Sequence, residues 1–138
     1  MIFRCARLTV FVLLSVAALP LAAHHSVASE FDSLHAMPIT GMIKRVDWTN
    51  PHVWIYVNVK DAAGNTVPWR VELAAPGALT RAGFEKNLLD LTSPVTIEVW
   101  PAFHDPQTGR AGNGRLLTLR DGRAFDVSDK WPDAIPVR

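Results

Sequence analysis

The chain has 138 residues, and its 14 Lys and Arg residues nearly balance its 13 Asp and Glu residues. This length is typical of one domain, and a charge so close to zero, without a basic stripe, argues against a nucleic-acid-binding protein. The one cysteine, Cys5, excludes an intramolecular disulfide.

Residues 1–23 have the layout of a secretory signal peptide. Basic residues precede an apolar run over residues 8–19, and the small residues Ala22 and Ala23 follow it. The run is shorter than the roughly 20 apolar residues that a membrane-spanning helix needs. We therefore expect export to the periplasm or out of the cell, with no cysteine and no membrane span in the mature chain.

We expect the mature chain to consist of an N-terminal arm over residues 24–36, a barrel domain over 37–128 and an irregular tail over 129–138. The arm has no sustained hydrophobic period. An extended segment or one short turn is therefore predicted for it.

Three strands are predicted in the first half of the barrel domain, over residues 39–48, 53–60 and 66–73. In the first, apolar residues change parity near Lys44-Arg45, and a β-bulge there would restore the inward register. The second alternates apolar and polar residues without interruption, and a Gly-Asn hairpin loop leads into the third. Pro68 indicates an edge or bulge position, because proline cannot donate to a strand ladder.

The pattern changes after the third strand. A proline in the first turn and a glycine at the end predict a short helix over residues 76–83. A fourth strand is expected over 95–103, followed by a long Gly-rich loop over 104–114 that we expect to be mobile. A fifth strand over 115–120, a tight Asp-Gly turn and a short return over 123–127 complete the domain.

Three strands, a short helix and two further strands follow the order of the five-stranded OB barrel. The predicted fold class is therefore all-β with a small α content. It is a five-stranded OB-like barrel with one short helix between strands three and four. A β-sandwich and an open half-barrel are the alternatives.

Short motifs are spread over nearly the whole mature chain. They are His24-His25-Ser26, Glu30-Phe31-Asp32, the stretch from Val46 to Val57 that contains Trp48-Thr49-Asn50-Pro51-His52, Glu72-Leu73, Leu79-Thr80-Arg81-Ala82-Gly83 and Asp121-Gly122-Arg123. In these motifs the chain resembles a family of small exported bacterial proteins that is classed as a domain of unknown function. The resemblance implies export and a single β-rich domain, and it brings no established activity.

The start of the mature chain is a candidate copper site. Cleavage after Ala23 would leave His24 with a free amine, and its amine and imidazole would chelate one metal ion together. His25, His52 or His104 could supply a further imidazole. Cleavage one residue earlier would place His25 third in the chain, where nitrogen atoms surround Cu(II) in a square plane, an arrangement that this ion prefers. The alternative is weak adventitious binding by two histidines in an arm.

His52 follows Asn50-Pro51 at the predicted turn between the first two strands. A histidine there is either a ligand that faces the arm or a residue that caps the strand end through a backbone hydrogen bond. A ligand imidazole has its second nitrogen held by a carboxylate or a carbonyl. Asp47 and Glu72 are the candidates for this role.

Trp54 and Tyr56 share the outward face of the second strand, and Trp100 is expected on the corresponding face of the fourth. OB barrels bind extended ligands on this surface through stacked aromatic rings. These residues and Asn50 are therefore candidates for ligand or partner binding. The alternative is that the arm and the Pro-rich tail cover the rings. Trp69 has the opposite parity on its strand, and we expect it in the core.

No catalytic constellation is visible in the sequence. The mature chain lacks a cysteine nucleophile, a Gly-x-Ser-x-Gly motif and a glycine-rich phosphate loop after a strand. The sequence favours a non-enzymatic, exported binding domain that holds Cu(II) through its N-terminal histidines. The alternative is a structural or interaction module that binds a periplasmic partner protein or an extended small ligand on its aromatic face.

Overall fold

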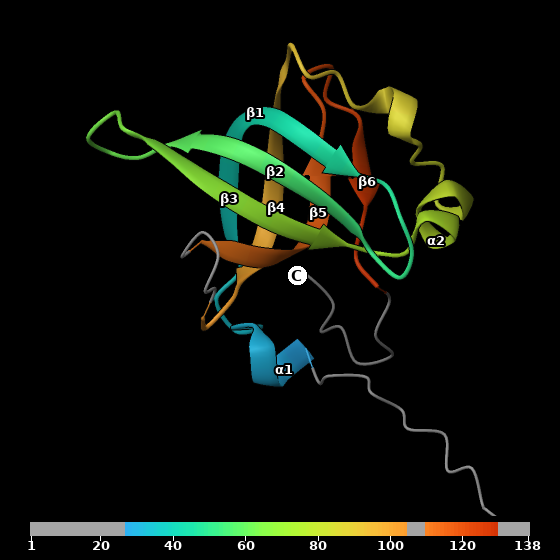
Figure 1. Ribbon diagram of the computed structural model, residues 1–138, viewed down its shortest axis with the longest axis horizontal. Helices are drawn as coiled ribbons and strands as arrows, with labels where there is room; N and C mark the ends of the chain where they lie inside the picture. Colours follow the sequence, from blue (N-terminus) through green and yellow to red (C-terminus); the bar gives the residue numbers. More distant parts are fainter. Residues whose placement is uncertain (1–26, 105–109, 130–138) are drawn as a thin grey trace, which may run out of the picture.

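A computed structural model describes residues 27–104 and 110–129 of the chain (Figure 1). Its elements are α1 (Val27–Glu30), β1 (Met37–Asp47), β2 (Val53–Lys60), β3 (Thr66–Leu73), α2 (Pro76–Arg81), the 3-10 helix η1 (Lys86–Leu88), β4 (Pro94–Pro101), β5 (Ala111–Thr118) and β6 (Ala124–Asp126). The strands curve around one interior, and α1 lies apart from α2 and η1 (Figure 1).

The strand order is β3-β2-β1-β4-β5-β6, and β3 also pairs with β5. This last pairing is parallel, with Arg70 opposite Ala111 and Glu72 opposite Asn113. It closes the first five strands into a barrel, and α2 connects β3 to β4. Strand order, parallel closure and helix position are those of the OB barrel, so the predicted fold class is confirmed.

β1 carries the predicted bulge. Ile43 pairs with Val57 and Arg45 with Tyr56, which leaves Lys44 as the extra residue. Before the bulge β1 pairs mainly with β4, and from Gly41 onward it pairs with β2. The bulge therefore lies where β1 passes from one neighbour to the other, and such bends allow a small barrel to close.

The predictions for β2 and β3 agree with the structure at both ends of each strand. The inward residues of β2 are buried because its alternation places every second side chain inside the barrel. Trp69 is buried, as expected for a core residue. Pro68 is exposed in the part of β3 that β5 does not reach, and this is the edge position that the sequence indicated.

The prediction of a Gly-rich loop over residues 104–114 is wrong for its last part, because β5 begins at Ala111. A Cβ atom at Gly112 would lie 2.9 Å from a backbone oxygen of β4, and one at Gly114 would lie 2.6 Å from a side-chain methyl group of β3. These glycines let three strands approach one another where the barrel closes. Residues 105–109 lie outside the described part. The other predicted elements agree with the structure to within two residues at each end.

The interior is apolar. Its buried members include Ile39, Ile43, Val53, Ile55, Val57, Trp69, Val71, Leu73, Leu79, Val95, Ile97, Val99, Leu117 and Val127. Phe84, which follows α2, is buried, and its ring centroid lies 6.0 Å from that of Trp48 and 5.2 Å from that of Phe125. These rings pack the residues after α2 onto the barrel.

The segment after α1 is attached to the barrel. Phe31 is 7% exposed and forms an isolated antiparallel bridge with Ala102. The Phe103 amide donates a hydrogen bond to the Glu30 carbonyl oxygen over 3.0 Å. The end of the predicted arm is therefore held beside the residues that follow β4.

Candidate functional site

A cleft of about 360 Å³ lies over the outer face of β2 and β3, beside α1 and the residues that follow β4. Its lining consists of Ser29, Glu30, Phe31, Trp54, Arg70, Glu72, Ala102, Phe103, His104 and Ala111. OB barrels bind extended ligands on the face of strands two and three, next to the loops that follow strands one and four. The cleft occupies that position, which makes it the candidate binding site.

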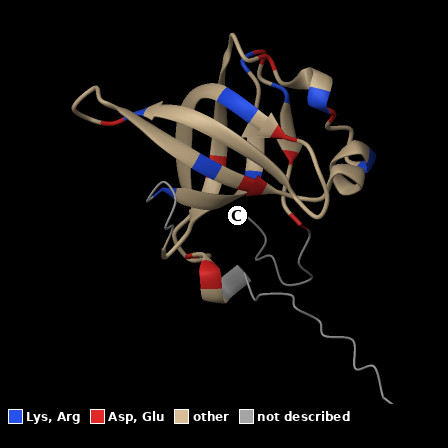
Figure 2. Ribbon diagram, in the orientation of Figure 1, with Lys and Arg blue, Asp and Glu red and all other residues tan. Residues whose placement is uncertain are grey.

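Trp54 forms one wall of the cleft. The alternation of β2 sends its side chain outward, while Val53 and Ile55 on either side are buried. Arg70 of β3 covers the ring, with its guanidinium carbon 4.5 Å from the ring centroid. A cation–π contact therefore presents a flat ring and a planar cation together. Glu72 is the next outward residue of β3, and Figure 2 shows basic and acidic positions close together along this strand.

The other two predicted aromatic residues are also covered by arginines. Arg45 lies over the Tyr56 ring at 3.8 Å, and Arg115 lies over the Trp100 ring at 4.9 Å. Both rings face outward and are half-buried. Neither lines the cleft, so of the three predicted rings Trp54 alone belongs to the candidate site.

His52 lies in the loop between β1 and β2, and carboxylates contact both of its ring nitrogens. Nδ1 contacts Oε1 of Glu72, and Nε2 lies 3.0 Å from Oδ2 of Asp129. Of the two acidic residues proposed from the sequence as partners of His52, Glu72 takes this role. Asp47 instead pairs with Arg45 over 2.9 Å.

The carboxylates of Glu72 and Asp129 contact opposite edges of the His52 imidazole. Their oxygens and a free ring nitrogen therefore do not meet at one point where a metal ion could bind. A neutral imidazole carries one N–H, so it can donate a hydrogen bond to one of these two carboxylates. Burial raises the pKa of Glu72, and the nearby His52 opposes this rise. His52 therefore links the β1–β2 loop to β3 through Glu72 and to the segment after β6 through Asp129.

Of the two predicted metal ligands that fall within the described residues, His104 lines the cleft and His52 does not. His104 is exposed, whereas His24 and His25 lie outside the described residues. Asn50 is exposed, precedes a cis peptide bond to Pro51 and does not line the cleft. Within residues 27–104 and 110–129, no group of three or more His, Cys, Asp and Glu residues is arranged to hold a metal ion.

Sequence reasoning missed several residues of this region, among them Glu30, Arg70, Phe103 and Asp129. Arg70 and Glu30 line the cleft, as does Phe103, whose side chain is 65% exposed. The alternation of β3 places Arg70 on the outer face of the barrel. This could have identified it from the sequence, because the pairing of β3 with β2 puts it beside the aromatic residues of β2. Asp129 falls in the predicted tail, and no spacing in the sequence connects it with His52.

The closed barrel and the cleft over β2 and β3 define a small OB-like domain with a candidate surface site. A family model described as a family of unknown function, DUF6152, matches residues 11–111, and the chain belongs to this family. The resemblance to a domain of unknown function is thereby confirmed. No curated protein and no solved structure matches the chain. Among the described residues, no helix has the length and apolar character needed to cross a membrane.

Proposed function

We propose that this chain is an exported, non-enzymatic binding domain that takes an extended small ligand in the cleft beside Trp54. The observation that carries the proposal is the stacked pair of Trp54 and Arg70 inside a cleft at the ligand-binding position of OB barrels. The face of an aromatic ring stacks on flat ligand groups of many kinds, and a guanidinium adds directed hydrogen bonds.

The walls of the cleft support the same function. Phe103 offers an exposed ring opposite the barrel face, and Glu30 and Glu72 add carboxylates beside Arg70. Apolar surface with a few convergent polar groups is the usual composition of a small-ligand site. The backbone bond between Phe103 and Glu30 holds two walls of the cleft together.

Native mass spectrometry of the protein purified from the periplasm tests this proposal. We expect an intact mass that corresponds to cleavage after Ala22 or Ala23, and a bound small molecule that is lost in Trp54→Ala. Tyr56→Ala is the matched control, because Tyr56 lies on the same face of β2 under an arginine but outside the cleft. A wild-type protein without a bound mass, or a bound mass retained in Trp54→Ala, would count against the proposal.

Copper binding through the N-terminal histidines is the second candidate function. The observation that favours it is His104, which lies in the cleft next to Phe103 and hence beside the end of α1. His24 and His25 precede α1 by only a few residues in the sequence. His52 is the weaker candidate for the remaining imidazole, because both of its nitrogens already have carboxylate partners.

Cu(II) titration of the mature protein, followed by EPR, separates this candidate from adventitious binding. One tight nitrogen-rich tetragonal signal should be lost in His24→Ala and weakened in His104→Ala. His35→Ala is the control, because His35 pairs with Asp32 on the surface and does not line the cleft. A weak signal that is the same in all three variants would end the copper interpretation.

A further inference from the structure

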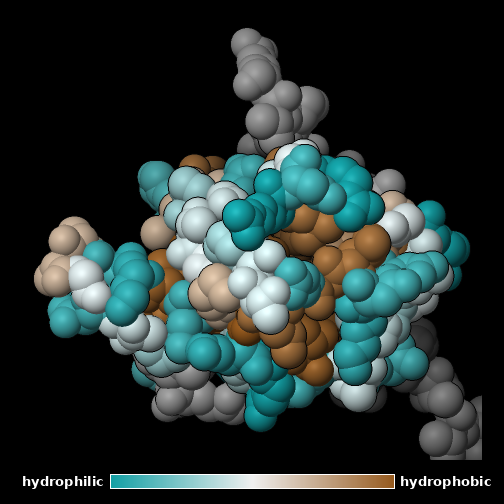
Figure 3. Space-filling view, turned by 90° about the horizontal axis from the view of Figure 1, so that it is seen from above, coloured by the Kyte–Doolittle hydropathy of each residue, from teal (hydrophilic) through white to brown (hydrophobic). Residues whose placement is uncertain are grey.

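A second hollow, of about 440 Å³, lies where η1, the start of β4 and the β5–β6 turn meet. Figure 3 looks onto the barrel from above and shows hydrophobic side chains gathered among hydrophilic ones. The hollow shares no lining residue with the cleft beside Trp54. A ligand bound here would therefore not depend on the function proposed for that cleft.

The floor of the hollow is apolar and comes from three segments of the chain. Val95 on β4 is 3% exposed, Leu119 after β5 is 9% exposed, and Leu88 of η1 is partly buried against the core. The antiparallel pairing of β4 with β5 fixes the first two relative to each other. A preformed apolar floor of this kind suits the alkyl or aryl part of a small molecule.

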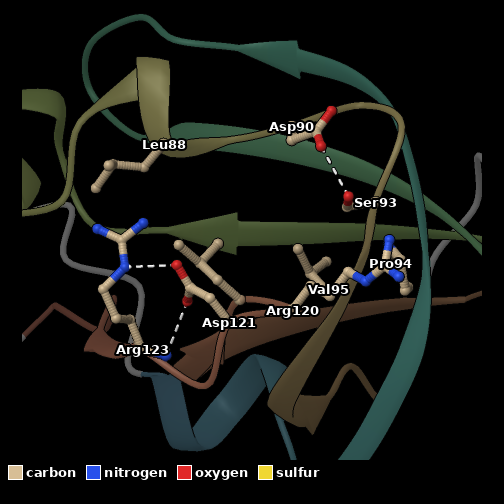
Figure 4. A pocket seen from close by; sticks show the side chains of 9 residues that line it. Leu88, Asp90, Ser93, Pro94, Val95, Arg120, Asp121 and Arg123 are labelled. Carbon is tan, nitrogen blue, oxygen red and sulfur yellow. Dashed lines mark hydrogen bonds and ion pairs between the residues drawn. The ribbon is translucent and has the colours of Figure 1, made fainter.

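The two carboxylates at the rim are occupied by their own neighbours (Figure 4). Asp90 accepts hydrogen bonds from the hydroxyl groups of Thr92 at 2.6 Å and Ser93 at 2.7 Å. Asp121 accepts from Nε of Arg123 at 2.8 Å and from the Arg123 amide at 3.0 Å. Arg123 balances the charge of Asp121, whereas Asp90 keeps its charge, which also acts on a further cation at the rim.

Arg120 supplies that cation. It is exposed, lines the hollow and makes no hydrogen bond or ion pair with another residue of the described chain (Figure 4). A guanidinium binds a carboxylate through two parallel hydrogen bonds. We propose that the hollow binds an amphipathic carboxylate, with its apolar body on Leu88, Val95 and Leu119 and its carboxylate on Arg120.

The probe for this site is dodecanoate, titrated below its micelle concentration into the mature protein while amide chemical shifts are recorded. We expect saturable shifts at Leu88, Val95, Leu119 and Arg120. Arg120→Gln should weaken binding by about tenfold, because it removes a charged hydrogen-bonding partner from the ligand. Since Arg120 has no bonded partner among the described residues, this variant should fold as the wild type does.

Two controls make the result specific. Arg81→Gln removes a similarly exposed arginine from α2, outside the hollow, and should leave dodecanoate affinity unchanged. Dodecyltrimethylammonium has the same chain with the opposite charge and should bind more weakly than dodecanoate. Equal affinity for the two probes, unchanged affinity in Arg120→Gln, or shifts confined to the cleft beside Trp54 would overturn the proposal.

Discussion

Oδ2 of Asp129 lies 3.0 Å from Nε2 of His52, and this ion pair ties the segment after β6 to the loop between β1 and β2. The same segment is also held by its backbone. The Ala74 amide donates to the Val127 carbonyl over 2.8 Å, and the Val127 amide donates to the Arg115 carbonyl over 2.9 Å. The side-chain pair therefore reinforces a connection that closes the barrel next to the candidate site.

Asp129→Ala should loosen this connection without unfolding the barrel. The His52 and Asp129 side chains are each more than a third exposed, so their pair contributes at most about 1 kcal/mol. We expect hydrogen exchange of the Ala74 and Val127 amides to accelerate by up to about fivefold. Asp61→Ala removes a carboxylate from the β2–β3 hairpin and should leave both amides unchanged. Equal exchange in the wild type and Asp129→Ala would show that backbone bonds alone hold the segment.

His52→Asn should raise the pKa of Glu72 further above its usual range. Burial already raises this pKa, and the charge and hydrogen bond of His52 are the causes that lower it. A raised carboxyl pKa means that ionisation costs folded stability, a loss that sets in as pH rises from the unfolded-state pKa toward the folded one. In His52→Asn this loss should extend to higher pH.

Carboxyl-carbon NMR titration measures this effect directly. His35→Asn is the matched control, because the hydrogen bond from His35 is the largest cause that lowers the pKa of Asp32. That variant should raise the pKa of Asp32 and leave the pKa of Glu72 unchanged. A Glu72 pKa that is the same in the wild type and His52→Asn would show that His52 does not stabilise its charged form.

Gly41→Ala should destabilise the barrel, whereas Gly77→Ala should not. A Cβ atom at Gly41 would collide with the backbone oxygen of Asn58 on β2, and a backbone group cannot move aside cheaply. The nearest atom to a Cβ at Gly77 is Nη1 of Arg81 at 3.5 Å, and alanine favours the helix that contains it. Urea unfolding should show a loss of about 1–3 kcal/mol for the first and none for the second. Similar losses in both variants would contradict this reason.

Alternation of apolar and polar residues was enough to predict β2 and β3, because of any two successive residues in these strands one points into the barrel and the other points outward. It failed at the start of β5. Gly112 and Gly114 are typical of a loop in a single sequence, but the closed barrel needs glycine there because neighbouring strands leave no room for a Cβ. That requirement exists only once three strands have met, so no local pattern reveals it.

The residues of the candidate site were likewise predictable only in part from the sequence. Alternation predicted Trp54 and Glu72 on the outer face, and Asn50-Pro51 predicted His52 at the turn before β2. The choice of Glu72 over Asp47 depends on the register of β2 with β3, which puts Trp54 opposite Glu72. The contributions of Phe103 and Asp129 come from segments far away in the chain, and only the folded barrel brings them to the same face.

Thr92→Val should make the protein less stable in acid. Hydrogen bonds from the Thr92 and Ser93 hydroxyl groups and from the Thr92 amide lower the pKa of Asp90 to about 2. A lowered carboxyl pKa contributes stability above the unfolded-state value, and that contribution is lost as pH falls toward the folded-state pKa. Without the hydroxyl group of Thr92, the pKa of Asp90 should rise toward its ordinary range and the midpoint of acid unfolding should move to higher pH.

The matched control for this change is Thr66→Val, which removes a hydroxyl group that accepts a hydrogen bond from Lys60 and touches no carboxylate. It should leave the Asp90 pKa and the acid midpoint unchanged. Circular dichroism against pH gives the midpoint, and carboxyl-carbon NMR gives the pKa of Asp90. If the pKa of Asp90 rises in Thr92→Val while the acid midpoint stays the same, the hydrogen bonds of this turn persist in the acid-unfolded chain, so that unfolding of the barrel does not change the pKa of Asp90. If the pKa itself does not move, the Ser93 hydroxyl and the Thr92 amide are sufficient to hold the charge.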